Sequence, residues 1–173
     1  MYFGGVMTVH PDKEHRRQAK WTNTVSLIGW LALTFCASAT SAFVKTGGWY
    51  ADLAKPTWNP PSWVFGPVWT ALYIMMAVAA WLVWRQGGWK AQRGPLTLYI
   101  VQWALNALWT PLFFGLQRPG LAFGEILILL VAIVTTIVAF WRVRPVAAWL
   151  LLPYALWVTF AAVLNFTIWR LNA

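Results

Sequence analysis

Long apolar stretches without Lys or Arg dominate this sequence of 173 residues. They occupy residues 24–44, 64–84, 95–116, 121–141 and 146–169. Each has about the 20 residues that an α-helix needs to cross a hydrocarbon layer of about 30 Å. Lipid admits only segments with internally satisfied backbones, and these stretches lack the strict alternation of a β-barrel. The sequence therefore predicts an all-α, polytopic membrane protein, a bundle of five transmembrane helices.

The composition excludes several other classes of protein. Hydrophobic residues make up 60% of the chain and charged residues 10%, which is too apolar for an ordinary soluble domain. The net charge of +9 is carried by residues at the ends of the apolar stretches. Cations are expected there in a membrane protein, so we predict a lipid bilayer and no nucleic acid as partner. One Cys and two His provide no basis for a disulfide framework or a metal cluster.

Basic residues also predict the topology. A polar, basic tail (residues 1–22) precedes the predicted transmembrane domain (residues 23–173). Nine of the 13 Lys and Arg residues fall in this tail and in the second and fourth connections, which lie on one side of a five-span protein. The positive-inside rule places that side, and the N-terminus, in the cytoplasm of a bacterial cell.

The first apolar stretch has an alternative interpretation. Basic residues, an apolar segment and the small residues Ala37-Ser38-Ala39 resemble a signal peptide with its cleavage site. The apolar stretch continues to Val44, however, and this favours a retained transmembrane helix.

The first connection, residues 45–63, is longer than the others and rich in Trp and Pro. It has too many prolines for one helix and too many aromatic residues for a flexible linker. We interpret it as a lid on the mouth of the bundle, with an interfacial aromatic belt as the alternative. We expect Ser62 to cap the helix that follows.

Polar residues inside the apolar stretches share helical faces with large aromatic rings. The shared faces are Gln102, Asn106, Trp109 and Phe113; Trp157, Ala161, Leu164 and Asn165; and Trp69 with Tyr73. Buried amides need partners, so these faces should turn into the bundle. Taken singly, the amides are explained by hydrogen bonds between helices. Together with the indoles they indicate a pocket for a large, flat, mostly apolar ligand.

The remaining residues suggest no catalytic group. Glu125 is the one acidic residue inside the apolar stretches, near the start of the fourth. We expect it to cap that helix or to reach the interface, because a negative charge suits a helix N-terminus. The sequence has no nucleophile elbow, phosphate-binding Gly loop, paired carboxylates or metal-ligand cluster.

Four blocks of residues carry a resemblance to a known family. They read Trp49-Tyr50-x-x-Leu53-x-Lys55-Pro56-x-Trp58-x-Pro60-Pro61; Gly66-Pro67-Val68-Trp69-Thr70-x-Leu72-Tyr73; Gln102-x-x-Leu105-Asn106-x-x-Trp109-x-Pro111-x-Phe113-Phe114-Gly115; and Pro153-Tyr154-x-x-Trp157-x-x-x-Ala161-x-x-Leu164-Asn165-Phe166. Over Leu27 to Asn172 the chain resembles the translocator protein family, also called tryptophan-rich sensory protein or TspO/MBR.

The resemblance implies a homodimer that binds tetrapyrroles such as protoporphyrin IX and haem as ligands, with no required cofactor and no metal site. Its function would be that of a sensor, scavenger or transporter in tetrapyrrole or stress regulation. The implied ligand-binding residues, with Ala39 added from the first stretch, are Ala39, Tyr50, Pro60, Phe65, Trp69, Asn106, Trp109, Trp157, Ala161 and Leu164.

The resemblance leaves two other functions open. One is light-dependent degradation of porphyrin, in which Trp69 and Trp157 would donate electrons; the other is a transporter or scaffold without bound porphyrin. Phe166 replaces a Tyr of the family's sterol-recognition segment, which disfavours sterol binding. Thr97 and Val101 replace the small residues associated with dimer packing, so the dimer interface is left open.

Overall fold

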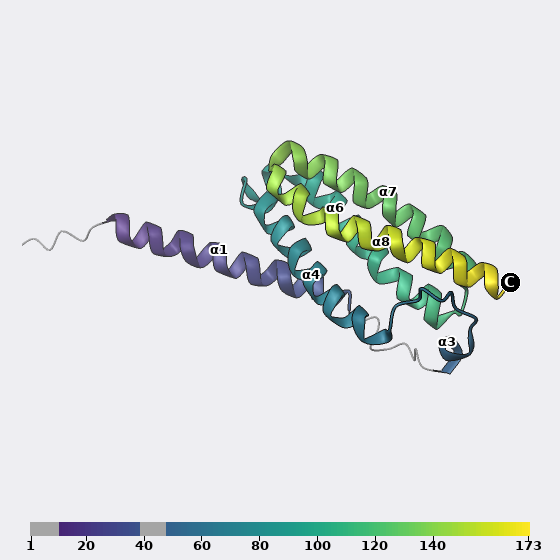
Figure 1. The fold of residues 1–173 in the computed structure, drawn as a ribbon. Coiled ribbons are helices and arrows are strands. Elements are labelled where there is room, and N and C mark those ends of the chain that lie inside the picture. Colours follow the sequence, from purple (N-terminus) through teal and green to yellow (C-terminus); the bar gives the residue numbers. More distant parts are fainter. Residues whose placement is uncertain (1–10, 39–47) are drawn as a thin grey trace, which may run out of the picture.

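The computed structural model describes residues 11–38 and 48–173, and for residues 11–22 it describes the backbone alone. Within these ranges all regular structure is helical, which confirms the all-α class. The elements are α1 (Pro11–Cys36), α3 (Gly48–Asp52), α4 (Ser62–Trp84), α5 (Gly88–Ala91), α6 (Arg93–Thr110), the π-helix η1 (Pro111–Gly115), α7 (Pro119–Val143) and α8 (Pro145–Leu171). The long helices α1, α4, α6, α7 and α8 form one bundle, from which the first half of α1 protrudes (Figure 1).

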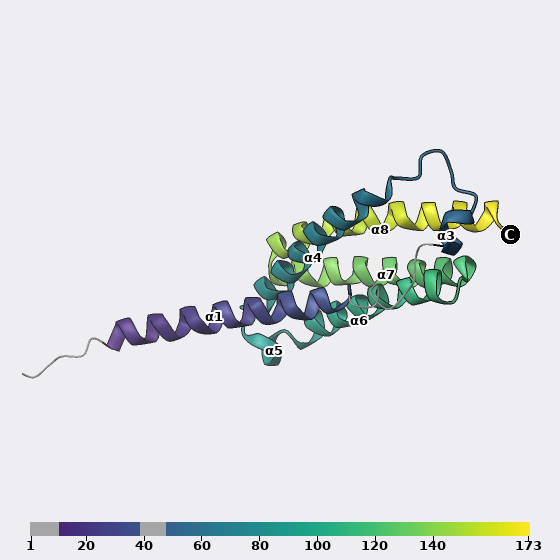
Figure 2. The same ribbon diagram turned by 90° about the horizontal axis from the view of Figure 1, so that it is seen from below.

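The long helices pack in a closed ring. Helix α4 lies beside α1 and α8, and α7 lies beside α8 and α6 (Figure 2). The ring is completed between α1 and α6, where the buried hydroxyls of Thr34 and Tyr99 are 2.7 Å apart. The indole of Trp103 also donates to the Thr34 carbonyl at 3.3 Å. These polar contacts sit in an otherwise apolar core, where each hydrogen bond between helices satisfies a group that lipid could not.

Helix length and hydropathy show a multi-pass membrane protein. Three helices, α4, α7 and α8, are long and apolar enough to cross a membrane. Helix α1 contributes a shorter apolar stretch, Asn23–Cys36. Helix α6 has 18 residues and continues directly into η1. Large apolar side chains of α7 and α8, such as Val131 and Leu156, are exposed on the outside of the bundle, where lipid would cover them. The count of five spans stays a prediction.

The helices follow the predicted stretches except at α1. The stretches 64–84, 121–141 and 146–169 lie within α4, α7 and α8, and 95–116 covers most of α6 and η1. Helix α1 instead begins at Pro11 in the basic tail and ends at Cys36, while residues 39–44 of the first predicted stretch lie outside the described residues. Its last turn closes with a hydrogen bond from the Ser38 hydroxyl to the Phe35 carbonyl at 2.6 Å. Such local side-chain bonds compete with a continuing helix.

The start of α4 corrects the predicted cap. Ser62 is the first helical residue, Pro61 precedes it with extended backbone, and no side chain caps the helix. Pro61 takes the N-cap position because its ψ of 142° is extended while its φ is −56°, and its ring carries no oxygen that could accept a hydrogen bond from the first helical N–H groups. The prediction that Ser62 caps α4 is therefore wrong.

The π-helix at the end of α6 shapes the region beneath the loop. Pro111 has no N–H with which to continue an α-helical ladder, and the following turn is wider. The Leu116 N–H donates to the Pro111 carbonyl at 2.8 Å, a span of five residues. This turn stacks Phe113 on Trp109, with ring centroids 4.9 Å apart, and brings Phe114 to 5.9 Å from the same indole.

Candidate ligand-binding cavity

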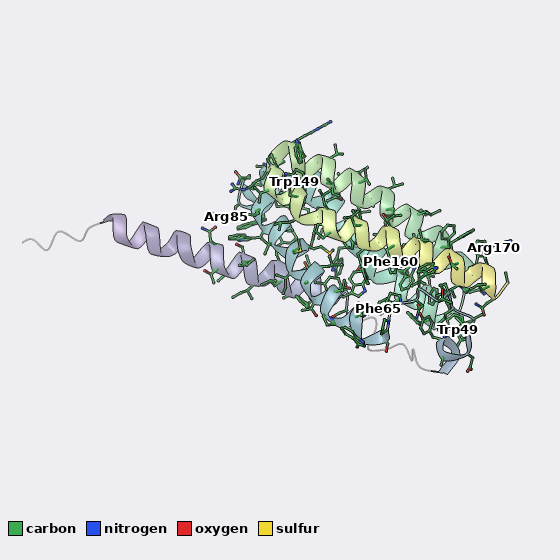
Figure 3. All side chains as sticks on the ribbon, in the orientation of Figure 1. Trp49, Phe65, Arg85, Trp149, Phe160 and Arg170 are labelled. Atoms are coloured by element: carbon green, nitrogen blue, oxygen red, sulfur yellow. The ribbon has the colours of Figure 1, made fainter. Side chains whose placement is uncertain are left out.

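A cavity of about 760 Å³ opens inside the bundle, beneath the segment that joins α3 to α4. Residues of α1, α4, α6, η1, α7 and α8 form its walls. Tyr50 of α3, Asn59 and Pro60 border it from the loop, the described part of the first connection from residue 48 to residue 61. Figure 3 shows the loop end of the molecule by Trp49 and Phe65, with Arg85 and Trp149 at the opposite end. The size falls within the range of about 300–1,000 Å³ that is typical of ligand sites.

The structure brings nearly all predicted ligand residues to this one cavity. The lining contains Tyr50, Pro60, Phe65, Trp69, Asn106, Trp109, Trp157, Ala161 and Leu164. Ala39, the remaining member of the predicted set, lies outside the described residues. Their role in binding a ligand stays a prediction, but the helical faces proposed for them do converge.

Aromatic rings form much of the wall. Trp157 packs edge-on against Phe65, with centroids 5.8 Å apart, and lies tilted on Phe160 at 5.4 Å. Trp69 lies tilted on Tyr73 at 5.2 Å. Each indole is thus held by another aromatic ring, an arrangement that stabilises its orientation beyond simple burial. The cavity offers pre-ordered apolar faces to a ligand.

Two amides join the helices around the cavity. The Asn106 Oδ1 accepts a hydrogen bond from the Tyr73 hydroxyl at 3.3 Å and so links α6 to α4. The Asn165 Oδ1 accepts from the Trp109 indole at 3.1 Å, while its Nδ2 donates to the Pro119 carbonyl at 2.7 Å. Asn165 therefore ties α8 to both α6 and α7. Both amides therefore link helices by hydrogen bonds, as the sequence analysis expected of each amide taken singly.

Gln102 shares the helical face of Asn106 but not its surroundings. Its side chain is 1% exposed, does not line the cavity, and has no hydrogen-bond partner for either amide atom among the described residues. The spacing correctly predicted that Gln102 turns inward. The spacing could not show that the cavity reaches Asn106 on α6 but not Gln102.

Glu125 corrects a second prediction. It is 6% exposed, and neither carboxylate oxygen has a hydrogen-bond partner among the described residues. The N-cap of α7 is Arg118, and Glu125 follows by nearly two turns on the face that buries Ala122 and Leu129. The predicted role as a cap or interfacial group is therefore wrong, because this face of α7 packs into the bundle.

The segment above the cavity is held by its own contacts. The Tyr50 hydroxyl donates to Asn59 Oδ1 at 3.2 Å, and the Tyr50 ring packs against Phe114 with centroids 5.4 Å apart. Burial raises the pKa of Tyr50, and the bond to Asn59 opposes this rise in part. Lys55 donates to the carbonyls of Ala51 and Leu53 at 2.9 and 3.0 Å. These contacts favour the interpretation as a lid, whereas Trp63, at 73% exposed, fits the aromatic belt.

Several lining residues escaped the sequence reasoning. Ile126 and Leu129 bring α7 into the cavity wall, and Asn59 and Phe114 border it from the loop side. In the sequence, Ile126 and Leu129 look like any lipid-facing apolar residue. Their spacing with Ile133 marks a helical face, but only packing shows which face turns inward.

Comparison with known proteins agrees with this architecture. The TspO/MBR family model matches residues 20–170. The chain belongs to this family. It is 45% identical to the human translocator protein over 136 residues, 76% of this chain and 80% of the relative. It is 42% identical over 147 residues to the tryptophan-rich protein TspO of Chlorobaculum tepidum, covering 82% and 90% of the two chains.

A third relative is the tryptophan-rich sensory protein of Cereibacter sphaeroides. It is 40% identical over 147 residues, which covers 82% of this chain and 91% of the relative. The matched regions include the loop and the cavity-lining helices, since the family model extends from residue 20 to residue 170. The protein is thus a multi-pass membrane protein of the TspO/MBR family.

Proposed function

We propose that this TspO/MBR protein binds a tetrapyrrole, such as protoporphyrin IX or haem, in the cavity beneath the loop. The observation that carries the proposal is a space of about 760 Å³ walled by Trp69, Trp109 and Trp157. Flat aromatic faces stack well on a planar, mostly apolar macrocycle. The few amides near the wall, such as Asn106, can orient its polar edge.

In this proposal the bound tetrapyrrole makes the protein a sensor, a scavenger or a transporter in the membrane. The names of its relatives, translocator protein and tryptophan-rich sensory protein, support that range of roles. The loop supports it too, because Tyr50 and Pro60 border the cavity and would have to move, or let the ligand pass, on entry. Binding and release would then depend on the contacts that hold the loop.

Titration of the purified protein with protoporphyrin IX tests the proposal. We expect a Kd in the micromolar range or tighter, a binding free energy of about −8 kcal/mol. Changing Trp69 and Trp157 together to Ala should weaken binding by roughly tenfold or more, since two stacking faces are lost. Trp149→Ala is the matched control, because that indole is exposed at the opposite end of the bundle (Figure 3). Equal affinity of wild type and double variant would refute the site.

Light-dependent degradation of the bound porphyrin is a second candidate. It is favoured by the position of two oxidisable indoles, Trp69 and Trp157, in the same cavity wall. An excited porphyrin would take an electron from indole, and dioxygen would serve as the final oxidant. Illumination with product analysis checks this: Trp157→Phe should slow porphyrin loss without abolishing binding. An unchanged rate would remove Trp157 from the reaction.

A transporter or scaffold without bound porphyrin is the outcome if titration shows no binding. Porphyrin flux into liposomes separates transport from binding alone. We further propose a homodimer in a bacterial cell membrane, with the N-terminus in the cytoplasm. The uneven distribution of the 13 Lys and Arg residues supports this orientation. Light scattering of the purified protein tests the homodimer, and reporter fusions at both termini, expressed in a bacterial cell, test the orientation in its membrane.

A further inference from the structure

A second hollow lies at the end of the bundle away from the loop, between the start of α6 and the end of α7. This groove has a volume of about 670 Å³. Its lining includes Arg93, Gly94, Thr97 and Leu98 of α6 and Ala139 and Arg142 of α7. It shares no residue with the cavity beneath the loop, which begins at Asn106 on α6 and ends at Leu129 on α7.

Apart from the two arginines and Thr97, the lining of the groove is apolar. Gly94 of α6 and Ala139 of α7 carry small side chains, so the two helices leave a channel between them, which Thr97 also lines. Leu98 adds an apolar side chain. A space of this shape on the outside of a membrane bundle suits a flexible hydrocarbon chain, because small residues let a chain approach the helix backbone closely.

The rim of the groove is positively charged. Arg93 and Arg142 face it from the two helices, and both are exposed. The chain has four acidic residues, and the two whose side chains are described lie elsewhere. Asp52 is in α3, and Glu125 is buried in the inward face of α7. Neither of the two described carboxylates therefore lies near these guanidinium groups, whose positive charge and planar set of N–H donors suit a phosphate.

Exposed tryptophans indicate how deep in the membrane the two arginines of the groove lie. Trp89 in α5, Trp141 next to Arg142, and Trp149 in the first part of α8 are all exposed. Trp141 and Trp149 pack together with ring centroids 5.6 Å apart. Tryptophan concentrates at the boundary between headgroups and hydrocarbon. The arginines thus lie at headgroup level, and the apolar lining extends from there into the hydrocarbon layer.

We propose that this groove binds one anionic phospholipid. The phosphate lies between Arg93 and Arg142, and an acyl chain runs over Gly94, Thr97 and Ala139. Basic pockets between transmembrane helices bind anionic headgroups by this combination of charge and apolar contact. A second copy of the chain fits less well, because a two-fold axis through the groove would bring like-charged arginines together. The inference does not depend on the tetrapyrrole proposal.

Native mass spectrometry of the full-length protein in detergent tests it. The probes are phosphatidylglycerol and phosphatidylcholine with identical acyl chains. We expect one retained phosphatidylglycerol per chain and a preference over phosphatidylcholine of about tenfold or more, since two arginines contribute. Changing Arg93 and Arg142 together to Gln should abolish the preference. Changing Lys90 and Arg144 together to Gln removes the same charge at the same end but outside the groove lining, and should preserve it.

Two further experiments test separately the apolar lining, which would hold the acyl chain, and the arginines, which would hold the phosphate. Ala139→Phe keeps both arginines and fills the groove, and we expect it to lower phosphatidylglycerol retention with the fold preserved by circular dichroism. Inorganic phosphate at equal concentration should not displace the lipid. The proposal is overturned by equal retention of the two lipids or by an equal loss in both double variants. It is also overturned by displacement with phosphate, by full retention in Ala139→Phe, or by a dimer that dissociates in the Arg93/Arg142 variant.

Discussion

The side-chain amide of Asn172 pairs with the backbone of Ala54 through two hydrogen bonds. The Ala54 N–H donates to Asn172 Oδ1 at 2.9 Å, and Asn172 Nδ2 donates to the Ala54 carbonyl at 2.9 Å. Nδ2 also donates to the Ile168 carbonyl at 2.8 Å, which anchors the amide on α8. The C-terminal end of α8 thus holds the loop above the cavity, although 118 positions separate the two residues in the chain.

Asn172→Ala should loosen the loop. Two hydrogen bonds are lost, which together contribute about 1–2 kcal/mol to the closed position, or roughly 5- to 30-fold in the opening equilibrium. Hydrogen exchange at the Ala54 amide should accelerate by that factor, and bound porphyrin should dissociate faster. Leu171→Ala, at an exposed neighbouring position, is the control and should change neither rate. Unchanged exchange at Ala54 in Asn172→Ala would show that other contacts hold the loop.

Asn165→Leu should destabilise the junction of three helices. The substitution removes the acceptor of the Trp109 indole and the donor to the Pro119 carbonyl. Leaving buried polar groups without partners costs about 1–3 kcal/mol each. We expect a lower apparent melting temperature in detergent micelles. Thr167→Val is the control, because the Thr167 hydroxyl is exposed and bonds only within α8. Equal melting temperatures of Asn165→Leu and wild type would argue against a structural role for this junction.

Gly120→Ala should be destabilising, while Gly124→Ala should not. A Cβ at Gly120 would come within 2.8 Å of the Trp169 ring, so α7 and α8 would have to separate or the indole would have to turn. Such overpacking typically costs about 1–3 kcal/mol. A Cβ at Gly124 meets nothing within 4 Å, and Ala favours the helix by up to about 1 kcal/mol. Thermal unfolding of the two variants should therefore shift in opposite directions, and a shift of Gly120→Ala to higher temperature would contradict the close helix approach.

Thr34 and Tyr99 should behave as a coupled pair. Their hydroxyls are 2.7 Å apart in the buried contact between α1 and α6. Thr34→Val keeps the shape of the side chain but leaves the Tyr99 hydroxyl without this partner, at a cost of about 1–3 kcal/mol. Adding Tyr99→Phe removes the orphaned hydroxyl, so the double variant should lose less stability than the sum of the single ones. Strict additivity of the three melting shifts would indicate no interaction between the two hydroxyls.

The loop should be insensitive to pH until Tyr50 ionises. Burial raises the pKa of Tyr50 above its usual value of about 10, and the hydrogen bond to Asn59 opposes part of that rise. A raised pKa means that the folded loop favours the neutral hydroxyl. This contribution is fully present below about pH 10 and is lost as the pH rises through the higher, folded-state pKa. The protection factor in the loop, which is exchange corrected for the base-catalysed intrinsic rate, should fall only in that alkaline range, and Tyr50→Phe should lose this fall. A fall of the protection factor near neutral pH would point to a different group.

Much of the cavity follows from local spacing. Asn106 and Trp109 lie on one face because an α-helix repeats every 3.6 residues, and lipid does not satisfy an amide. The same reasoning placed Trp157, Ala161 and Leu164 together on α8, and the structure puts all five at one cavity. Their binding of a tetrapyrrole stays a prediction, as does any role of Ala39, which lies outside the described residues.

Hydropathy and the repeat of a single helix were enough to predict four of the five long helical segments, the membrane setting and the inward direction of the polar faces; α1, which begins at Pro11, departs from its predicted stretch. Which neighbour each face meets depends on tertiary packing. Glu125 was expected at the interface and is buried, and Asn172 reaches Ala54 across the chain. Such outcomes depend on the packing of segments far apart in sequence, and no property of one helix specifies its partner.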